Sequence, residues 1–339
     1  MKKRYVLFAA LLALFLLTCA AQAEPPQIDA NDWMNTLTDL VEQTGNRESF
    51  SENEGRAAAY LTRVWEAQGY TQADGALQIQ NIPSPWEVAY ETGWEDGVYN
   101  LIATKKALYD DPPVIIVCAH YDTFYNTVGA KDNGSGVAAM LTLSKAFAAM
   151  EPYKNTELRF IAFAGEEYDD VGSAGYVDSL TTAEARRVLA VFNIDLIAVE
   201  EGAANIALCC NTLGGRRSDG SYLAGGDGAP VDNSVSIAFS KAFWALGGFT
   251  EQQRDVDFCL PRHWGEGDHT AFHNAYIDAA TICFQGNVSV GGAWPADMHA
   301  PEDNLDKQFD MGRTQHALNV LALAIDSLAT EHEYGDVAE

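Results

Sequence analysis

The stretch Val114–Gly136, which reads VIIVCAHYDTFYNTVGAKDNGSG, decides the fold. It begins with six consecutive apolar residues, four of them β-branched, directly after a pair of prolines. A short, uninterrupted run of this kind predicts a strand that is buried on both faces. The run ends abruptly at His120, and an alanine-rich segment of helical period follows from Gly136. The stretch therefore predicts a buried strand, a polar loop and a helix.

The same alternation of strand and helix continues along the chain. Further strands are predicted at 76–82, 99–103, 158–164, 188–194, 205–210 and 279–284, and helices at 32–44, 55–69, 136–150, 172–180, 231–246, 268–274 and 313–329. Such alternation is typical of an α/β protein with helices on both faces of the sheet. We therefore predict a three-layer αβα sandwich with a mixed, mostly parallel central sheet, formed by one domain over residues 24–339.

The N-terminal segment has the pattern of a signal peptide. Lys2-Lys3-Arg4 is followed by an apolar stretch at 5–17, and Ala21-Gln22-Ala23 offers a cleavage site. We expect removal of residues 1–23 and export, either by secretion or to the periplasm or cell envelope. An uncleaved anchor and lipidation at Cys19 remain open. No later apolar run is long enough to span a bilayer, so we expect no membrane contact after cleavage.

The composition limits the classes of partner that the protein can bind. The formal net charge is −27, from 21 basic and 48 acidic residues, which disfavours binding to nucleic acids and anionic membranes. Solubility is the simplest explanation of this acidity, and cation binding by some carboxylates is a second one. The absence of a CxxC pair argues against a cysteine zinc site. Cys259 with Cys209 or Cys210 is a candidate disulfide. The sequence leaves the oligomeric state open.

Metal-binding side chains follow the predicted strands. They are His120, Asp132, Glu167 and Asp195, joined by His299 from a later loop. Any one of these residues at a strand end is more often a cap or a surface residue, but five in succession are harder to dismiss. Two imidazoles and three carboxylates suit zinc, with cobalt or manganese as alternatives. They suffice for two ions if one carboxylate bridges, and two ions about 3.5–4 Å apart can hydrolyse peptides or phosphates.

Two local spacings indicate roles for further residues. His120 and Asp122 are two apart in an extended segment, so they project to one face. Asp122 is therefore placed to orient the imidazole. Glu166 and Glu167 are adjacent and point in different directions, so that one carboxylate binds metal while the other faces the attacking water as a general base.

An ordered set of motifs then resembles a known family. AHYDT, GAKDNGSG, FAGEE with GSAGY, NIDL, GDHTAF and MHAPEDNLD are similar to motifs of the M28 metallopeptidases, across roughly 100–306. The resemblance implies a phosphorylase/hydrolase-like fold of the zinc-dependent exopeptidase type and two zinc ions. It assigns His120 and Asp195 to one ion, Glu167 and His299 to the other, Asp132 as the bridge, Glu166 as the catalytic acid/base and Asp122 as the residue that orients His120.

The chain departs from this family at two positions. Lys131 stands where the family usually has an acid beside the bridging aspartate, and Gly267 replaces a serine before Asp268 and His269. We expect Lys131 to tune the loop position or the local charge without removing a ligand. The acids that follow His299 are Glu302, Asp303 and Asp306. Capping of the next segment or shielding of the loop is their simplest interpretation, and additional metal ligation is the alternative.

The sequence thus predicts an exported zinc aminopeptidase that acts on peptides. A glutaminyl-cyclase-like acyltransferase, a carboxypeptidase and an inactive binding protein on the same fold are the alternatives. Asp268, His269 and His263 are candidate substrate residues, or supports of the pocket. His269 and His273 are four residues apart, but no glutamate follows the first, which argues against an HExxH zinc pair. The side-chain preference is not set by these motifs.

Overall fold

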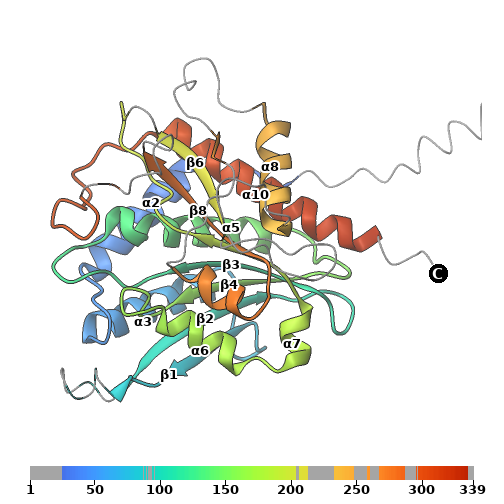
Figure 1. The fold of residues 1–339 in the computed structure, drawn as a ribbon, viewed down its shortest axis with the longest axis horizontal. Helices are drawn as coiled ribbons and strands as arrows, with labels where there is room; N and C mark the ends of the chain where they lie inside the picture. Colours follow the sequence, from blue (N-terminus) through green and yellow to red (C-terminus); the bar gives the residue numbers. More distant parts are fainter. Residues whose placement is uncertain are drawn as a thin grey trace, which may run out of the picture.

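A computed structural model describes residues 25–334, except 87, 89, 91–93, 95, 204–205, 213–232, 248–257, 260–266, 287–294 and 296. The predicted signal peptide and His263 lie outside the described residues. Within them an eight-stranded sheet is covered by helices on both faces (Figure 1). The predicted α/β class and three-layer arrangement are therefore confirmed. None of the described helices is long and apolar enough to cross a bilayer.

The sheet is mixed, with parallel strands at its centre. Its strands are β1 (Leu77–Ile82), β2 (Val98–Lys105), β3 (Val114–His120), β4 (Glu157–Phe163), β5 (Val188–Ile194), β6 (Ile206–Asn211), β7 (Phe258–Cys259) and β8 (Ala279–Gly286). Their spatial order is β1-β2-β4-β3-β5-β8-β6-β7. The neighbours from β4 to β8 run parallel, whereas β1 and β2 at one edge and the β8–β6 pair are antiparallel.

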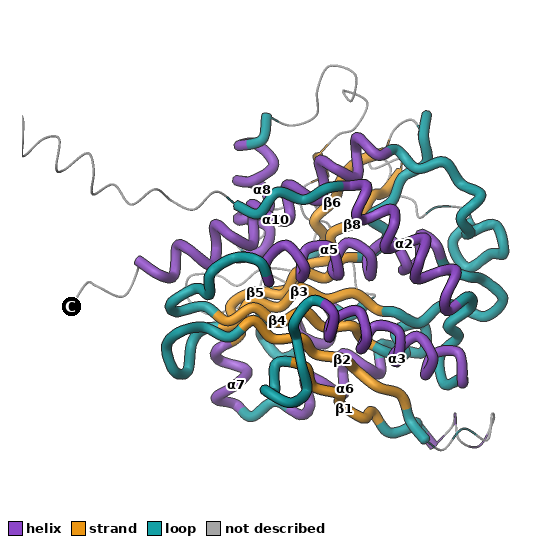
Figure 2. The backbone as a smooth tube through the Cα atoms, turned by 180° about the vertical axis from the view of Figure 1, so that it is seen from behind, coloured by secondary structure: helices purple, strands orange, loops and turns teal. Residues whose placement is uncertain are grey.

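The helices divide between the two faces of the sheet (Figure 2). On one face lie α2 (Ala30–Thr44), α3 (Glu52–Ala67), α5 (Gly136–Ala148), α8 (Ser234–Ala245) and α10 (Met311–Tyr334). On the other lie α6 (Val171–Ser179), α7 (Thr182–Arg187) and α9 (His269–Asn274). Alternate residues of β3 join the two apolar clusters, and all its side chains are buried. This two-sided covering explains why the strand is continuously apolar.

The predicted elements are present with ends shifted by a few residues, and β5 has the bounds that were expected. The short helix α7 was not predicted. It forms through a capping box in which Thr181 and Glu184 each satisfy the other's backbone N–H. Strand β7 was also not predicted, and it sets the backbone of Cys259 beside that of Cys209. The side chain of Cys259 lies outside the described residues, so the disulfide stays a prediction.

The topology gathers the predicted ligands along the side of the sheet at which the central parallel strands end. The parallel strands β3, β4 and β5 all end there, and the residues that leave them enter loops. After β3 the chain turns through η1 (Ala130–Ser135) before α5 begins. Ligand sites in open α/β sheets form at the carboxyl ends of the strands, and this edge carries the site described next.

Candidate metal centre

The five predicted ligands and Glu166 form two adjoining groups. His120, Glu166 and Asp195 offer ligand atoms within 4.8 Å of one another. Asp132, Glu167 and His299 form a second group by the same measure. Each group combines an imidazole with two carboxylates, which is a donor set that suits zinc. The structure thus brings together side chains that are separated by up to 179 positions (299 − 120) in the sequence.

Asp132 faces both groups. Its Oδ1 lies 3.3 Å from His120 Nε2, and its Oδ2 lies 3.1 Å from His299 Nε2. Burial opposes ionisation of this carboxyl, but its contacts with the two imidazoles hold its pKa below the usual range. One carboxylate with an oxygen directed to each group is the arrangement expected of a bridging ligand.

His120 provides the test of whether these residues fit a metal ion. Its Nε2 lies 3.7 Å from Asp195 Oδ1 and 3.8 Å from Glu166 Oε2. His120 Nε2 and Asp195 Oδ1 are buried and, in the part of the chain that the structure describes, lack a hydrogen-bond partner. Leaving such atoms unsatisfied costs about 1–3 kcal/mol each. A zinc ion bound by imidazole and carboxylate would satisfy His120 Nε2 and Asp195, so the residues fit the metal.

Asp122 does more than the sequence predicted. Its Oδ1 lies 3.4 Å from His120 Nδ1, as expected of a residue that orients the ring. The same carboxylate also accepts the backbone N–H groups of Glu166 and Glu167, both at 3.1 Å, and the hydroxyl of Ser49 at 2.6 Å. Asp122 therefore fixes the backbone of both glutamates at the end of β4. This second role depends on contacts between the loops that follow β3 and β4, which no spacing along the chain reveals.

Glu166 is a half-buried carboxyl within the first group. Burial raises its pKa well above the usual range, and the nearby acids Asp195 and Asp268 act in the same direction against the opposing effect of His120. A carboxyl group with a raised pKa returns a proton more readily than an exposed glutamate. The position and the pKa both suit the acid/base role expected of this residue.

His299 is held by an aromatic contact that the motifs did not reveal. The ring of Phe124 stacks on the imidazole with centroids 4.4 Å apart and planes at 14°. The backbone N–H of Phe124 also donates to Glu167 Oε1 at 3.1 Å. Phe124 thus touches both outer ligands of the second group. Its place four residues after His120, next to another aromatic residue, was the only signal in the sequence.

Further buried charged side chains form hydrogen bonds to the backbone of the loops that carry the predicted ligands. Asp303 accepts the backbone N–H groups of Lys131 and Asp132 at 2.7 and 3.0 Å. Arg47, which is fully buried, donates to three backbone carbonyls of the 121–129 segment. Glu54 accepts N–H groups from Phe50 and from the glycine that precedes Glu166. Of these three residues, the sequence analysis named only Asp303, as a cap, a shield of the loop or an additional ligand.

Two of the candidate substrate residues are fully buried. Asp268 and His269 have no exposed surface, and His269 Nδ1 lies 2.9 Å from the hydroxyl of Thr281. Burial raises the pKa of Asp268 well above the usual range, and Asp170 adds to that effect. Because neither side chain is open to a substrate in this structure, a supporting role is favoured over direct contact. His263, the third candidate, is not among the described residues.

The αβα sandwich therefore carries two adjoining groups of possible metal ligands at the ends of its central strands, and Asp132 lies between them. Comparison with family models makes the assignment specific. The model described as "Peptidase family M28" matches residues 100–325. This is more than half of the chain, and the protein belongs to that family.

Individual relatives agree with this assignment. Aminopeptidase YwaD of Bacillus subtilis is 30% identical over 227 residues, which cover 67% of this chain and 44% of that protein. The chain therefore spans less than half the length of this relative. The structure of BSAP, a zinc aminopeptidase from Bacillus subtilis, superposes with a TM-score of 0.70 at 19% identity and covers 88% of this chain and 94% of that one. A glutaminyl cyclase from Bacteroides thetaiotaomicron superposes with a TM-score of 0.64 at 16% identity, covering 89% and 99%.

Proposed function

We propose that this protein is a zinc-dependent aminopeptidase with two metal ions. The bridging position of Asp132, between two groups that each contain an imidazole, carries the proposal. Membership of family M28 and the names of the aminopeptidase relatives support the same substrate class. The substrates are then peptides, from which the N-terminal residue is removed.

The residues divide the chemistry as follows. His120 and Asp195 would hold one zinc, Glu167 and His299 the other, and Asp132 both. Bound zinc lowers the pKa of water and polarises a carbonyl group. The Glu166 carboxylate takes the proton of the attacking water and returns it to the departing amine. Asp122 keeps the imidazole of His120 and the backbone of Glu166 in place during these steps.

Glu166→Gln tests the assignment of the base. The amide cannot accept the proton, so we expect turnover of aminoacyl reporter substrates to fall by about 10²–10⁴-fold while the zinc content remains near that of the wild type. Glu167→Gln is the matched control, because it should lose zinc as well as activity. Ordinary turnover in Glu166→Gln would contradict the proposed role.

The similarity to a glutaminyl cyclase structure favours a second candidate, an acyltransferase that cyclises N-terminal glutamine. A peptide that begins with glutamine separates the two functions. Release of free glutamine supports the aminopeptidase, whereas loss of ammonia from an intact peptide supports the cyclase. Blocking the amino terminus abolishes aminopeptidase action and leaves carboxypeptidase action unchanged. Failure to process any of these peptides with zinc present would support the inactive binding protein.

Export remains part of the proposal. The basic, apolar and small-residue pattern of residues 1–23 supports it. Fractionation of the producing cells, followed by N-terminal sequencing, tests the expectation that the exported form begins at Glu24. An intact N-terminus in the membrane fraction would show an anchor instead.

A further inference from the structure

A group of four charged side chains beside the metal centre has no part in the chemistry described so far. We call it the lysine–carboxylate cluster, and it consists of Lys131, Glu200, Asp297 and Lys307. Lys131 Nζ forms ion pairs with Asp297 and, at 3.0 Å, with Glu200. Lys307 Nζ lies 3.0 Å from Asp297 and 3.3 Å from Glu200. Each lysine contacts both acids, so the four charges cancel.

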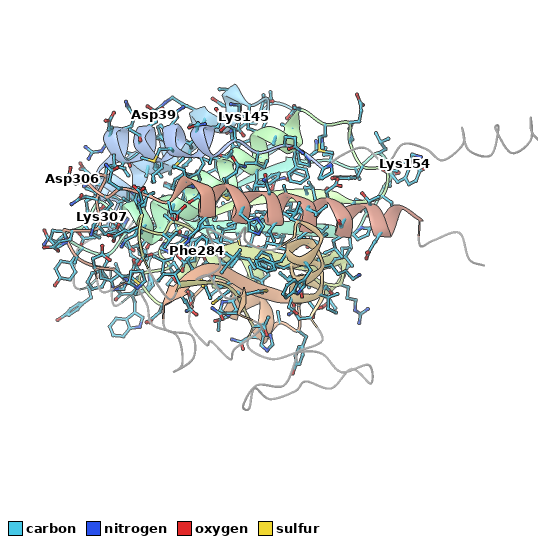
Figure 3. The ribbon with its side chains drawn as sticks, turned by 90° about the horizontal axis from the view of Figure 1, so that it is seen from above. Asp39, Lys145, Lys154, Phe284, Asp306 and Lys307 are labelled. Atoms are coloured by element: carbon cyan, nitrogen blue, oxygen red, sulfur yellow. The ribbon has the colours of Figure 1, made fainter. Side chains whose placement is uncertain are left out.

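The cluster connects three segments that carry metal ligands. Lys131 immediately precedes Asp132, the bridging residue. Asp297 lies two residues before His299, and Glu200 lies in the loop that follows β5 and Asp195. Lys307 completes the cluster just before α10 begins, at the end of the molecule where Figure 3 labels it.

The position of the Lys131 ammonium settles how it affects the centre. The side chain is only 3% exposed, and among the described residues its ion pairs are with Glu200 and Asp297. The positive charge is therefore neutralised away from the bridging carboxylate. Its influence on metal binding is mainly geometric. The buried ammonium requires a charged partner and therefore holds Asp297 in place.

The segment that carries His299 needs such a restraint. The backbone of His299 is in the left-handed region, with φ +64°, which costs a residue with a side chain about 1–3 kcal/mol and persists only when its surroundings hold it. Its ring is fixed by Phe124. The ion pair from Lys131 to Asp297 fixes the backbone on the N-terminal side of the same residue.

We propose that Lys131 is a positioning residue that holds His299 in place through Asp297 and so sets zinc affinity at the Glu167–His299 side of the centre. This inference rests on the proposed two-zinc function. The lysine ties the bridging loop to the His299 segment.

The test is a zinc titration of the metal-free, full-length protein. We expect the wild type to bind two ions in separable steps. In Lys131→Met the first step should be unchanged, and the second should weaken by about 10–100-fold, the usual effect of removing a residue that orients a ligand. Lys241→Met is the matched control. It removes one lysine from an exposed ion pair, 3.4 Å from Glu331, and should leave both steps unchanged.

A double-mutant cycle separates this role from a general loss of stability. Asp297→Ala removes the other half of the contact and tests it independently if Lys131→Met does not fold. The losses in the second step should not add in the double variant, since both changes break one contact. The inference about Lys131 would be overturned if both single variants kept the second-step zinc affinity of the wild type, or if their losses of affinity added in the double variant. Either result would leave the two-zinc proposal standing. A wild type that binds a single zinc would overturn the two-ion proposal as well.

Discussion

At the scale of the residue, the metal centre depends on side chains with two tasks. Asp122 faces His120 and also holds the backbone of both glutamates. Phe124 stacks on His299 through its ring and donates to Glu167 through its backbone. Such shared supports couple the ligands, because moving one supporting residue displaces two of them.

Phe124→Ala isolates the contribution of the ring. The backbone donor to Glu167 remains, so the change removes only the stacking on His299. We expect zinc affinity at the second group to fall by about tenfold, measured by metal titration of the zinc-free protein. Tyr109→Ala is the control, since that side chain is also 61% exposed and lies before β3, at the opposite end of the strand from the centre. Equal losses in the two variants would show that the stacked ring has no specific role.

At the scale of the element, the turn η1 between β3 and α5 needs an anchor from outside. Asp303 supplies it by accepting two consecutive N–H groups, those of Lys131 and Asp132. The carboxylate comes from the segment after His299, so the bridging loop and the histidine loop are held together. The arrangement explains how the backbone N–H groups of a buried loop can find hydrogen-bond acceptors although the loop does not join the sheet.

Asp303→Asn tests this anchor. An amide presents one accepting oxygen in place of two, so one buried N–H loses its partner, at a cost of about 1–3 kcal/mol. Urea denaturation of the zinc-free protein should report this loss of unfolding free energy. Asp306→Asn, at an exposed position in the same segment, should change it by less than about 0.5 kcal/mol. A comparable effect in both variants would argue against the anchor.

At the scale of the whole molecule, the sheet brings the five proposed ligands from separate segments into one acidic centre. In the metal-free protein, the contacts that His299 makes with Asp132 and Glu167 raise its pKa to about 10. The imidazole is therefore protonated at neutral pH. Zinc requires the neutral form, so binding must displace a proton.

Zinc affinity should consequently increase with pH. A group with a raised pKa keeps its proton until the pH approaches that value, so acidification from pH 8 to 6 should weaken binding by about tenfold per pH unit for each proton released. Titrations at several pH values, with calorimetry in buffers of different ionisation enthalpy, measure this slope. His299→Ala should bind less zinc and show a smaller slope. A slope that is unchanged in the variant would contradict the assignment.

The order of the elements was predictable because it rests on local patterns. The apolar run of β3, the helical period of α5 and the bounds of β5 were all read from neighbouring residues. The short helix α7 and the strand β7 were missed. A single capping box forms the first, and pairing with β6 forms the second.

The sequence alone determined the α/β class and the candidate ligands, because hydrophobic period and ligand chemistry belong to individual residues and their neighbours. Only the tertiary structure decided which carboxylate faces which imidazole. It also decided that Asp122 holds both glutamates and that Lys131 turns towards Asp297 and Glu200. These contacts join segments that are far apart in the chain. Their geometry follows from the strand order and the packing of the loops, which no spacing along the sequence contains.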